Sequence, residues 1–233
     1  MVARISRKPA GSELSREAVI ERALDLADAE SLDAVTVRRL AQEFGVTPMA
    51  LYWHVKNKDE LLEAMGDDFY AHISLTGLDD GTWQDRLAEI VDRLITTLRR
   101  HPASVSLAMP RILRCPRGCQ LTELTLQLLR DAGFDTARSA DIARTAMQTA
   151  IRLVADWPGA ENGVPCQERA SVVAAKREWI ARLPGDRFPR LAESIDALTN
   201  CDDSEAYFTG GKELFLFGVA ALLEKSRVSS RVS

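Results

Sequence analysis

A helix, a glycine turn and a second short helix, predicted over residues 36–58, constrain this chain more than any other feature. Thr36 is a good N-cap, because its hydroxyl can accept a hydrogen bond from the first helical turn. Gly45 supplies the left-handed residue that ends a helix and allows a tight turn. Ala41 stands four residues before Gly45 and Leu51 six after it, which is helix-turn-helix spacing. The apolar positions of the first helix recur at helical intervals (Val37, Leu40, Ala41 and Phe44).

The second helix of the pair should be short, about two turns. Thr47 is predicted to cap it, and Pro48 takes the first helical position, where a missing N–H costs nothing. The adjacent residues Tyr52 and Trp53 point about 100° apart on a helix, so at least one of them should face outward. An outer face of aromatic, histidine and lysine side chains indicates a nucleic-acid interface. The inward positions are Leu51 and Val55.

The charge distribution supports such an interface at one end of the chain. The whole chain has a net charge of −4, so its basic residues must be located before DNA binding is inferred. Six acidic residues lie between Glu13 and Glu30, whereas the stretch 38–58 carries four basic residues against Glu43 alone. A local cationic face on an acidic body fits a protein that contacts phosphates by one end.

The segments VRRLAQEFGV and LYWHVKNKDEL together resemble the DNA-binding domain of the TetR family of bacterial transcriptional regulators. The resemblance is strong over about residues 15–75, continues more weakly beyond, and includes the WQD that begins at Trp83. It implies an all-α fold, with an N-terminal three-helix helix-turn-helix domain and a larger helical ligand-binding and dimerisation domain. It also implies a homodimer that binds a palindromic double-stranded DNA operator, as a repressor released by a small-molecule effector.

The DNA-contacting residues are carried over from the family by position. Those at the start of the second helix approach base edges, later ones approach phosphates and bases, and basic flanking residues hold the backbone. Pro48, Met49 and Ala50 differ from the tetracycline-binding members, so a different operator is expected. The predicted set is Arg38, Thr47, Pro48, Met49, Tyr52, Trp53, His54, Lys56 and Lys58.

The chain divides into a flexible basic arm (1–14), the helix-turn-helix domain (15–60), the helical body (61–227) and a disordered tail (228–233). A basic arm beside the helix-turn-helix can touch DNA phosphates or the minor groove. Ser15 should start the first helix. Asn57 should cap a fourth, with Glu60 in a capping-box arrangement. The family resemblance implies that this fourth helix couples ligand binding to the position of the DNA-binding domain.

Helix start and stop signals, given by Pro, Gly and capping residues, divide the body into further helices. A proline within 102–114, Pro110, predicts a kink of the kind that often lines a cavity. Residues 157–165 read as a loop and 202–203 as a turn. The expected helices cover 82–100, 102–114, 116–132, 135–157, a segment ending at 183, 188–198 and 205–227.

Two functional surfaces are predicted in the body. An apolar effector pocket could be lined by aromatic and methionine side chains, although the expectation for each of them alone is ordinary core (Trp83, Met109, Met147, Trp157 and Trp179). Ile90, Leu94 and Ala108 replace the drug and metal contacts of tetracycline-binding relatives, so a different, hydrophobic effector is expected. The last helix has almost no polar face, and the family resemblance assigns it, with the helix at 135–157, to the dimer interface (Ile142, Ala146, Met147, Ala150, Leu214, Phe217 and Ala221).

The sequence offers little for an enzyme. It contains no nucleophile–base pair, metal cluster or glycine-rich phosphate loop, so no catalytic residue, metal or cofactor is expected. Cys115 and Cys119, with Pro116 between them, are interpreted as packed residues rather than a metal site. The start has no signal peptide and the longest apolar run, residues 214–223, is short for a membrane span, which favours the cytoplasm. Two alternatives stay open: the same fold acting as an activator or without an effector, and, remotely, an enzyme or helical interaction module.

Overall fold

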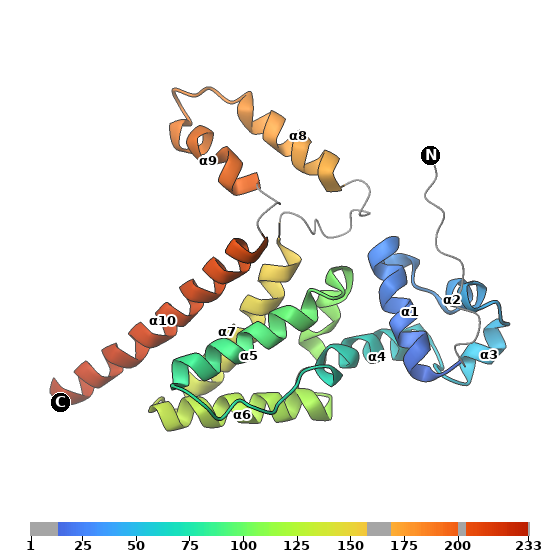
Figure 1. Cartoon of the computed structure of the whole chain (residues 1–233), viewed down its shortest axis with the longest axis horizontal. Coiled ribbons are helices and arrows are strands. Elements are labelled where there is room, and N and C mark those ends of the chain that lie inside the picture. Colours follow the sequence, from blue (N-terminus) through green and yellow to red (C-terminus); the bar gives the residue numbers. More distant parts are fainter. Residues whose placement is uncertain (1–13, 158–168, 200–203, 233) are drawn as a thin grey trace.

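The computed structural model describes residues 14–157, 169–199 and 204–232, and in this described part all regular secondary structure is helical, without a strand (Figure 1). Helices α1 to α3 form the head of the molecule, and α5 to α10 form the body. Helix α4 leads from one into the other. The bounds are α1 Arg16–Ala29, α2 Val37–Phe44, α3 Pro48–Tyr52, α4 Lys58–Ala71, α5 Trp83–Leu98, α6 Pro116–Ala132, α7 Thr136–Ala155, α8 Arg169–Ala181, α9 Pro189–Thr199 and α10 Ser204–Val232, with 3-10 helices η1 Leu32–Ala34, η2 Pro102–Leu107 and η3 Met109–Arg111.

Helix α1 begins where the sequence predicts, because the Ser15 hydroxyl accepts a hydrogen bond of 3.1 Å from the Ala18 N–H. Its apolar stripe is buried and packs on α2, α4 and η2. The helix therefore touches both the rest of the head and the body. The buried stripe includes all five predicted positions (Val19, Ile20, Ala23, Leu24 and Ala27).

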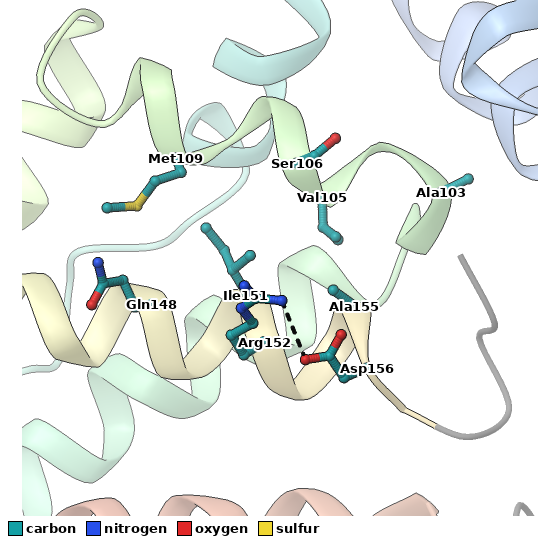
Figure 2. Close-up of a pocket in the computed structure, with 9 residues that line it drawn as sticks. All are labelled: Ala103, Val105, Ser106, Met109, Gln148, Ile151, Arg152, Ala155 and Asp156. Carbon is teal, nitrogen blue, oxygen red and sulfur yellow. Dashed lines mark ion pairs between the residues drawn. The ribbon is translucent and has the colours of Figure 1, made fainter. Parts of the chain in front are cut away.

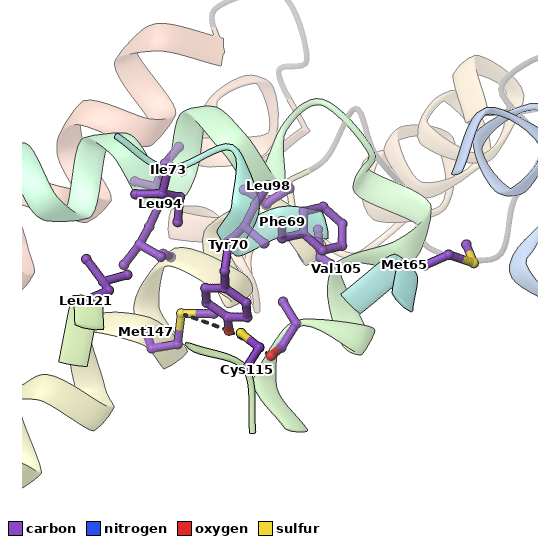
Figure 3. Close-up of a cluster of buried hydrophobic side chains, with 14 of the residues drawn as sticks. Met65, Phe69, Tyr70, Ile73, Leu94, Leu98, Val105, Cys115, Leu121 and Met147 are labelled. Atoms are coloured by element: carbon purple, nitrogen blue, oxygen red, sulfur yellow. Dashed lines mark hydrogen bonds between the residues drawn. The ribbon is translucent and has the colours of Figure 1, made fainter. Parts of the chain in front are cut away.

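Helix α4 is shared between head and body. Asn57 caps it as predicted, since its side-chain oxygen accepts a 2.8 Å hydrogen bond from the Glu60 N–H. The reciprocal bond of a capping box is shifted, because the Glu60 carboxylate accepts from the Lys56 N–H at 2.9 Å. The division predicted between residues 60 and 61 falls inside this helix. Its buried side chains begin at Leu61 and run into the core of the body (Met65, Phe69 and Tyr70; Figure 3).

The core of the body is built around α7, which packs against α5, α6 and α10. Helix α5 starts with a capping box, formed by Thr82 and Asp85. In Figure 3 the Tyr70 ring of α4 points toward Met147 of α7, and the Tyr70 hydroxyl lies 3.9 Å from the Met147 sulfur. Since this sulfur is a weak acceptor, the phenol has a stronger partner elsewhere, described below.

The segment 102–114 does not form the single kinked helix that the sequence predicts. It forms two short 3-10 helices, η2 and η3, which begin at or beside Pro102 and Pro110. Pro110 lacks the N–H that a continuous α-helix would use there, so the segment is broken into short 3-10 pieces. Pro102 stands at the first position of η2, where no N–H is needed. Short turns let this segment follow the surfaces of α1, α4 and α7, which it contacts.

The remaining helices follow the sequence closely. Helix α6 ends at Gly133, which has a φ of 106°, and α7 is capped by Asp135. Helices α8 and α9 pack against each other as a hairpin. Helix α10 continues to Val232, past residue 227, where the sequence predicts its end. The basic arm before residue 14, the loop residues 158–165 and the turn 202–203 lie outside the described residues.

Candidate nucleic-acid interface and cavity

The turn between α2 and α3 has the geometry predicted for it. The Thr36 hydroxyl accepts a 3.1 Å hydrogen bond from the Arg39 N–H at the start of α2. Gly45 ends the helix in the left-handed region, with φ 66° and ψ 33°. The next N–H, of Val46, returns to the Ala41 carbonyl at 3.0 Å, which completes a Schellman motif. A side chain other than glycine would be strained at residue 45.

Helix α3 is one turn long, shorter than predicted, and it is anchored from inside. Leu51 and Val55 are fully buried. Thr47 precedes the helix in extended conformation, but its side chain makes no capping hydrogen bond, so the predicted hydroxyl cap is wrong. The Thr47 carbonyl instead accepts from Ala50 at 3.0 Å, and Pro48 at the first position has no N–H to cap.

The outer face of α3 presents large apolar and aromatic side chains to solvent. Met49 is 68% exposed and Trp53 is 86% exposed, while Tyr52 is also exposed. Exposing such area on a folded surface loses hydrophobic stabilisation, so it indicates a surface that is covered by a partner. Both adjacent aromatics face outward, which exceeds the sequence expectation of at least one.

A clasp around Arg16 fixes the loop between α3 and α4. One Arg16 nitrogen donates to the His54 carbonyl at 2.8 Å and to the Glu60 carboxylate at 2.9 Å. The other Glu60 oxygen holds the Lys56 N–H, and these hydrogen bonds lower the pKa of Glu60 from its usual value. Arg16 was not among the predicted residues. The sequence feature that could have revealed it is a cation in the first turn of a helix. Such a cation opposes the helix dipole and therefore needs a partner elsewhere.

The basic residues of the head divide into two groups. Arg39 is used internally, since it pairs with Glu43 and with Glu30 at 2.7 Å. Arg22 also pairs with Glu43. The hydrogen bond from Arg22, and after it the one from Arg39, hold the pKa of the Glu43 carboxyl below its usual value. The second group stays on the solvent-exposed surface (Arg38, Lys56 and Lys58). This second group is therefore the one available to phosphates.

The nine predicted DNA-contacting residues thus lie on α2, α3, the following loop and the first turn of α4. Eight of them are exposed, and His54 is half-buried with its carbonyl engaged by Arg16. Their contact with DNA stays a prediction. The arrangement combines exposed cations with aromatic side chains on a protruding helix, which is how helix-turn-helix proteins enter the major groove.

A cavity of about 730 Å³ lies between η2–η3 and α7 (Figure 2). Its volume falls within the range of small-molecule sites in proteins. One wall comes from the proline-broken segment and the other from the C-terminal half of α7. It is lined by Ala103, Val105, Ser106, Met109, Gln148, Ile151, Arg152, Ala155 and Asp156.

Of the five predicted pocket residues, Met109 lines this cavity and the other four lie elsewhere. Trp83 packs edge-on against Phe134, and Met147 is buried beneath Tyr70. Trp157 lies beside Phe208, and Trp179 is exposed on α8. Aromatic content alone is a poor guide, because large rings fill the core. The missed signal was the polar row Gln148, Arg152 and Asp156, four residues apart on α7.

The cavity wall is bonded to helix α1 of the head. The Asp28 carboxylate of α1 accepts a 3.0 Å hydrogen bond from the Ala103 N–H, and Ala103 lines the cavity. The other Asp28 oxygen lies 2.8 Å from Nδ1 of His101, the residue before η2. A displacement of η2 therefore acts directly on α1.

The same wall is bonded to α4 at two points and lies close against it at a third. The Tyr70 hydroxyl donates to the Ala108 carbonyl at 2.7 Å, and burial raises the pKa of Tyr70, so the phenol stays a donor. Arg111 holds the Asp67 carboxylate with hydrogen bonds of 2.7 and 3.0 Å. Gly66 lets the backbones approach, because a Cβ there would stand 2.6 Å from the Leu107 carbonyl oxygen. Helix α4 and η2–η3 are therefore closely joined.

The predicted dimer residues fall into two classes. Those on α7 are buried within their own protomer, against α5, α6 and α10, and their contact with a partner stays a prediction (Ile142, Ala146, Met147 and Ala150). The small side chains of Ala146 and Ala150 serve packing inside the body. On α10, Leu214 is 78% exposed and Phe217 is 72% exposed, and Ala221 is exposed as well. A shallow groove beside them is lined by both helices, including Ile142 and Leu222.

Of the two cysteines interpreted as packed residues, Cys115 has a structural role and Cys119 does not pack as expected. The Cys115 sulfur accepts a 3.4 Å hydrogen bond from the Gly118 N–H and so caps α6. Burial raises the pKa of the Cys115 thiol, which keeps it protonated. Cys119 is exposed. Among the described residues, no group of three or more His, Cys, Asp and Glu side chains could hold a metal ion.

Residues 204–225 of α10 are long and apolar enough to cross a membrane by length and composition alone. The ten-residue apolar run considered in the sequence did not predict this. One such helix is weak support for a membrane protein. Lys212, within this stretch, pairs with Asp92 of α5 at 2.7 Å, which ties the helix to the body.

Comparison with known protein families matches both parts of the chain. The family described as "Bacterial regulatory proteins, tetR family" matches residues 19–65, and "Tetracyclin repressor-like, C-terminal domain" matches residues 76–223. The chain is 26% identical to an HTH-type transcriptional regulator of Saccharopolyspora erythraea over 208 residues, 89% of this chain and 85% of that protein. It is 27% identical to the class E tetracycline repressor protein of Escherichia coli over 216 residues, 92% of this chain and 94% of that protein.

Solved structures agree over nearly the whole length. A possible TetR family regulator from Streptomyces coelicolor has a TM-score of 0.72 at 26% identity, covering 89% of this chain and all of that one. ActR from Streptomyces coelicolor in complex with actinorhodin has a TM-score of 0.66 at 27% identity, covering 91% and 99%. The matched proteins are regulators rather than enzymes. With its helix-turn-helix head and its helical body both matched, the chain belongs to the TetR family of bacterial transcriptional regulators.

Proposed function

We propose that the protein is a homodimeric repressor that binds a palindromic operator and is released when a small-molecule effector occupies the cavity between η2–η3 and α7. The observation that carries this proposal is the bonding of one cavity wall to α1 of the head and to α4, which leads into the head. An occupant that displaces η2–η3 moves the helices that position α3. ActR, which contains actinorhodin in its solved complex, supports a ligand-responsive role for this fold.

The DNA-binding half rests on the exposed surface of the head. Met49 and Trp53 protrude from α3, and Arg38, Lys56 and Lys58 flank it. Cations supply sequence-independent attraction to phosphates, and side chains on a helix in the major groove read base edges. Because Pro48 and Met49 stand at the base-reading positions, the operator should differ from that of tetracycline repressors.

The homodimer rests on α10. Leu214 and Phe217 are exposed on one face of a long apolar helix, which favours burial against a second copy. One α3 helix contacts too few bases for useful selectivity. Two copies related by a two-fold axis read half-sites about 34–36 Å apart. A protein that acts on DNA in this way is expected in the cytoplasm.

The test is a salt-titrated binding assay of the purified protein on the DNA that flanks its own gene, with random DNA as control. The proposal predicts selective binding, one dimer per palindrome, and a steep fall of affinity with salt. Binding equal to the control across these flanking sequences speaks against this operator. A reporter strain lacking the gene then separates repression from activation, since loss of a repressor raises expression of the target.

A further inference from the structure

The wall of the cavity formed by α7 carries two parallel rows of side chains. Gln148, Arg152 and Asp156 are four residues apart and share one face of the helix. Ile151 and Ala155 form the second row, one position N-terminal to Arg152 and Asp156. Figure 2 shows these side chains rising from α7 toward η2–η3. The wall on α7 is therefore polar along one edge and apolar along the other.

The opposite wall is largely apolar. Val105 and Met109 come from η2 and η3, and Ser106 adds one hydroxyl between them. An apolar molecule alone would make no use of the Gln148 amide, the Arg152 guanidinium or the Asp156 carboxylate, which are exposed to solvent along this edge. A very polar molecule would gain nothing from the apolar faces. The lining thus selects a ligand with one apolar side and one polar edge.

Arg152 determines the sign of the charge on that edge. Its ion pair with Asp156 spans 3.5 Å between nitrogen and oxygen, longer than a charge-assisted hydrogen bond. The guanidinium fork matches a carboxylate or a similar anion through two parallel hydrogen bonds. Asp156 is exposed, so it stays hydrated when the anion of a ligand replaces it as the partner of Arg152. Replacing Asp156 by a ligand anion therefore costs little free energy.

We infer that the cavity takes an amphipathic organic anion, whose apolar body lies against Val105, Met109 and Ile151 and whose anionic oxygens are held by Arg152. Gln148 donates to a further oxygen along the same edge. The inference rests on the proposed function in treating this cavity as the effector site. A cationic ligand is the opposing case, since it would use Asp156 instead.

The test compares two fluorescent probes with the same ring system, the anion anilinonaphthalene sulfonate and the neutral N-phenylnaphthylamine. The readout is the affinity of the full-length protein for the anionic probe divided by its affinity for the neutral probe, both measured without DNA. Arg152→Gln should lower that ratio about tenfold, because it removes one charge-assisted hydrogen-bonding group at the cavity mouth. The matched control is Arg144→Gln, an exposed arginine two turns earlier on α7 and outside the cavity lining, which should leave the ratio unchanged.

An unchanged ratio in Arg152→Gln overturns the inference, whether or not both affinities fall together. Asp156→Asn supplies the second arm. It removes the competitor for Arg152, so affinity for the anionic probe should hold or rise, and a tenfold fall overturns the inference. Because no DNA is present, a protein that fails to bind its operator can still pass this test. The proposed function and the proposed ligand class can therefore be refuted independently of each other.

Discussion

Arg111 of η3 donates hydrogen bonds of 2.7 and 3.0 Å to both carboxylate oxygens of Asp67 on α4. The Arg111 side chain is 14% exposed, and Glu63 adds an ion pair at 3.2 Å. The hydrogen bonds to Asp67 have the largest effect on the pKa of Arg111 and, with the charge of Glu63, raise it above its usual value. The Arg111–Asp67 pair therefore stays charged. This bidentate pair joins the cavity wall to the helix that leads into the head.

The Arg111–Asp67 pair should be energetically coupled. In a double-mutant cycle with Asp67→Asn and Arg111→Met, we expect a coupling of about 1–2 kcal/mol, because the pair is bidentate and partly buried. Urea unfolding of the four proteins measures it. The exposed pair Arg144 and Asp141 on α7 is the control, with a coupling below about 0.5 kcal/mol. Equal couplings for the two pairs would refute the link.

Gly66 should be essential to the close approach of α4 and η2. Gly66→Ala places a Cβ 2.6 Å from a backbone oxygen, which forces the elements apart and destabilises the protein by about 1–3 kcal/mol. Gly210→Ala on α10 meets nothing within 4 Å, so it should be neutral or stabilise the helix by up to about 1 kcal/mol. Thermal unfolding of both variants measures the difference. A neutral Gly66→Ala would mean that this approach is not tight.

The sequence predicted the head well because local rules decide it. The caps at Ser15, Thr36 and Asn57 and the left-handed Gly45 each act within a few residues, so a single sequence reveals them. The exposed face of α3 followed from the burial of its opposite face. The Arg16 clasp was missed, because its partners lie 38 and 44 residues away.

The cavity and the dimer face were harder to predict. A methionine such as Met147 and a small residue such as Ala150 fit a pocket, an interface or a core equally well by periodicity. Which one holds depends on how α5, α6, α7 and α10 are arranged around them. The break at Pro110 was a local signal and pointed correctly to the cavity wall.

The ion pairs of Glu43 predict acid sensitivity. Arg22 and Arg39 hold the pKa of Glu43 below its unfolded value of about 4.3. Its stabilisation is therefore complete above that value and is lost as pH falls through the lower folded pKa. Urea unfolding between about pH 5 and 3 should show a smaller loss in Glu43→Gln than in the wild type. Glu21→Gln, on the exposed side of α1, should follow the wild type; identical behaviour of the Glu43 variant contradicts the account.

Phe217 should be central to dimerisation. Phe217→Glu removes an exposed ring from each of two symmetric copies and adds like charges, so the dissociation constant should rise at least about a hundredfold. Sedimentation equilibrium measures the change. Leu113→Glu, at an exposed apolar residue between η3 and α6, is the control and should leave the dimer intact. A Phe217 variant that remains dimeric would place the interface elsewhere.

The most direct test of the central claim is the dependence of operator affinity on salt for head variants, measured by fluorescence anisotropy on the flanking DNA. Lys58→Ala should weaken binding to all DNA and lower the slope of log affinity against log salt by about 1 for each phosphate that is no longer neutralised. Tyr52→Ala should weaken binding without unfolding the chain. Arg190→Ala on α9, an exposed cation outside the head, should change neither quantity. If Lys58→Ala and Tyr52→Ala both bind like the wild type, the head surface assigned to DNA is wrong.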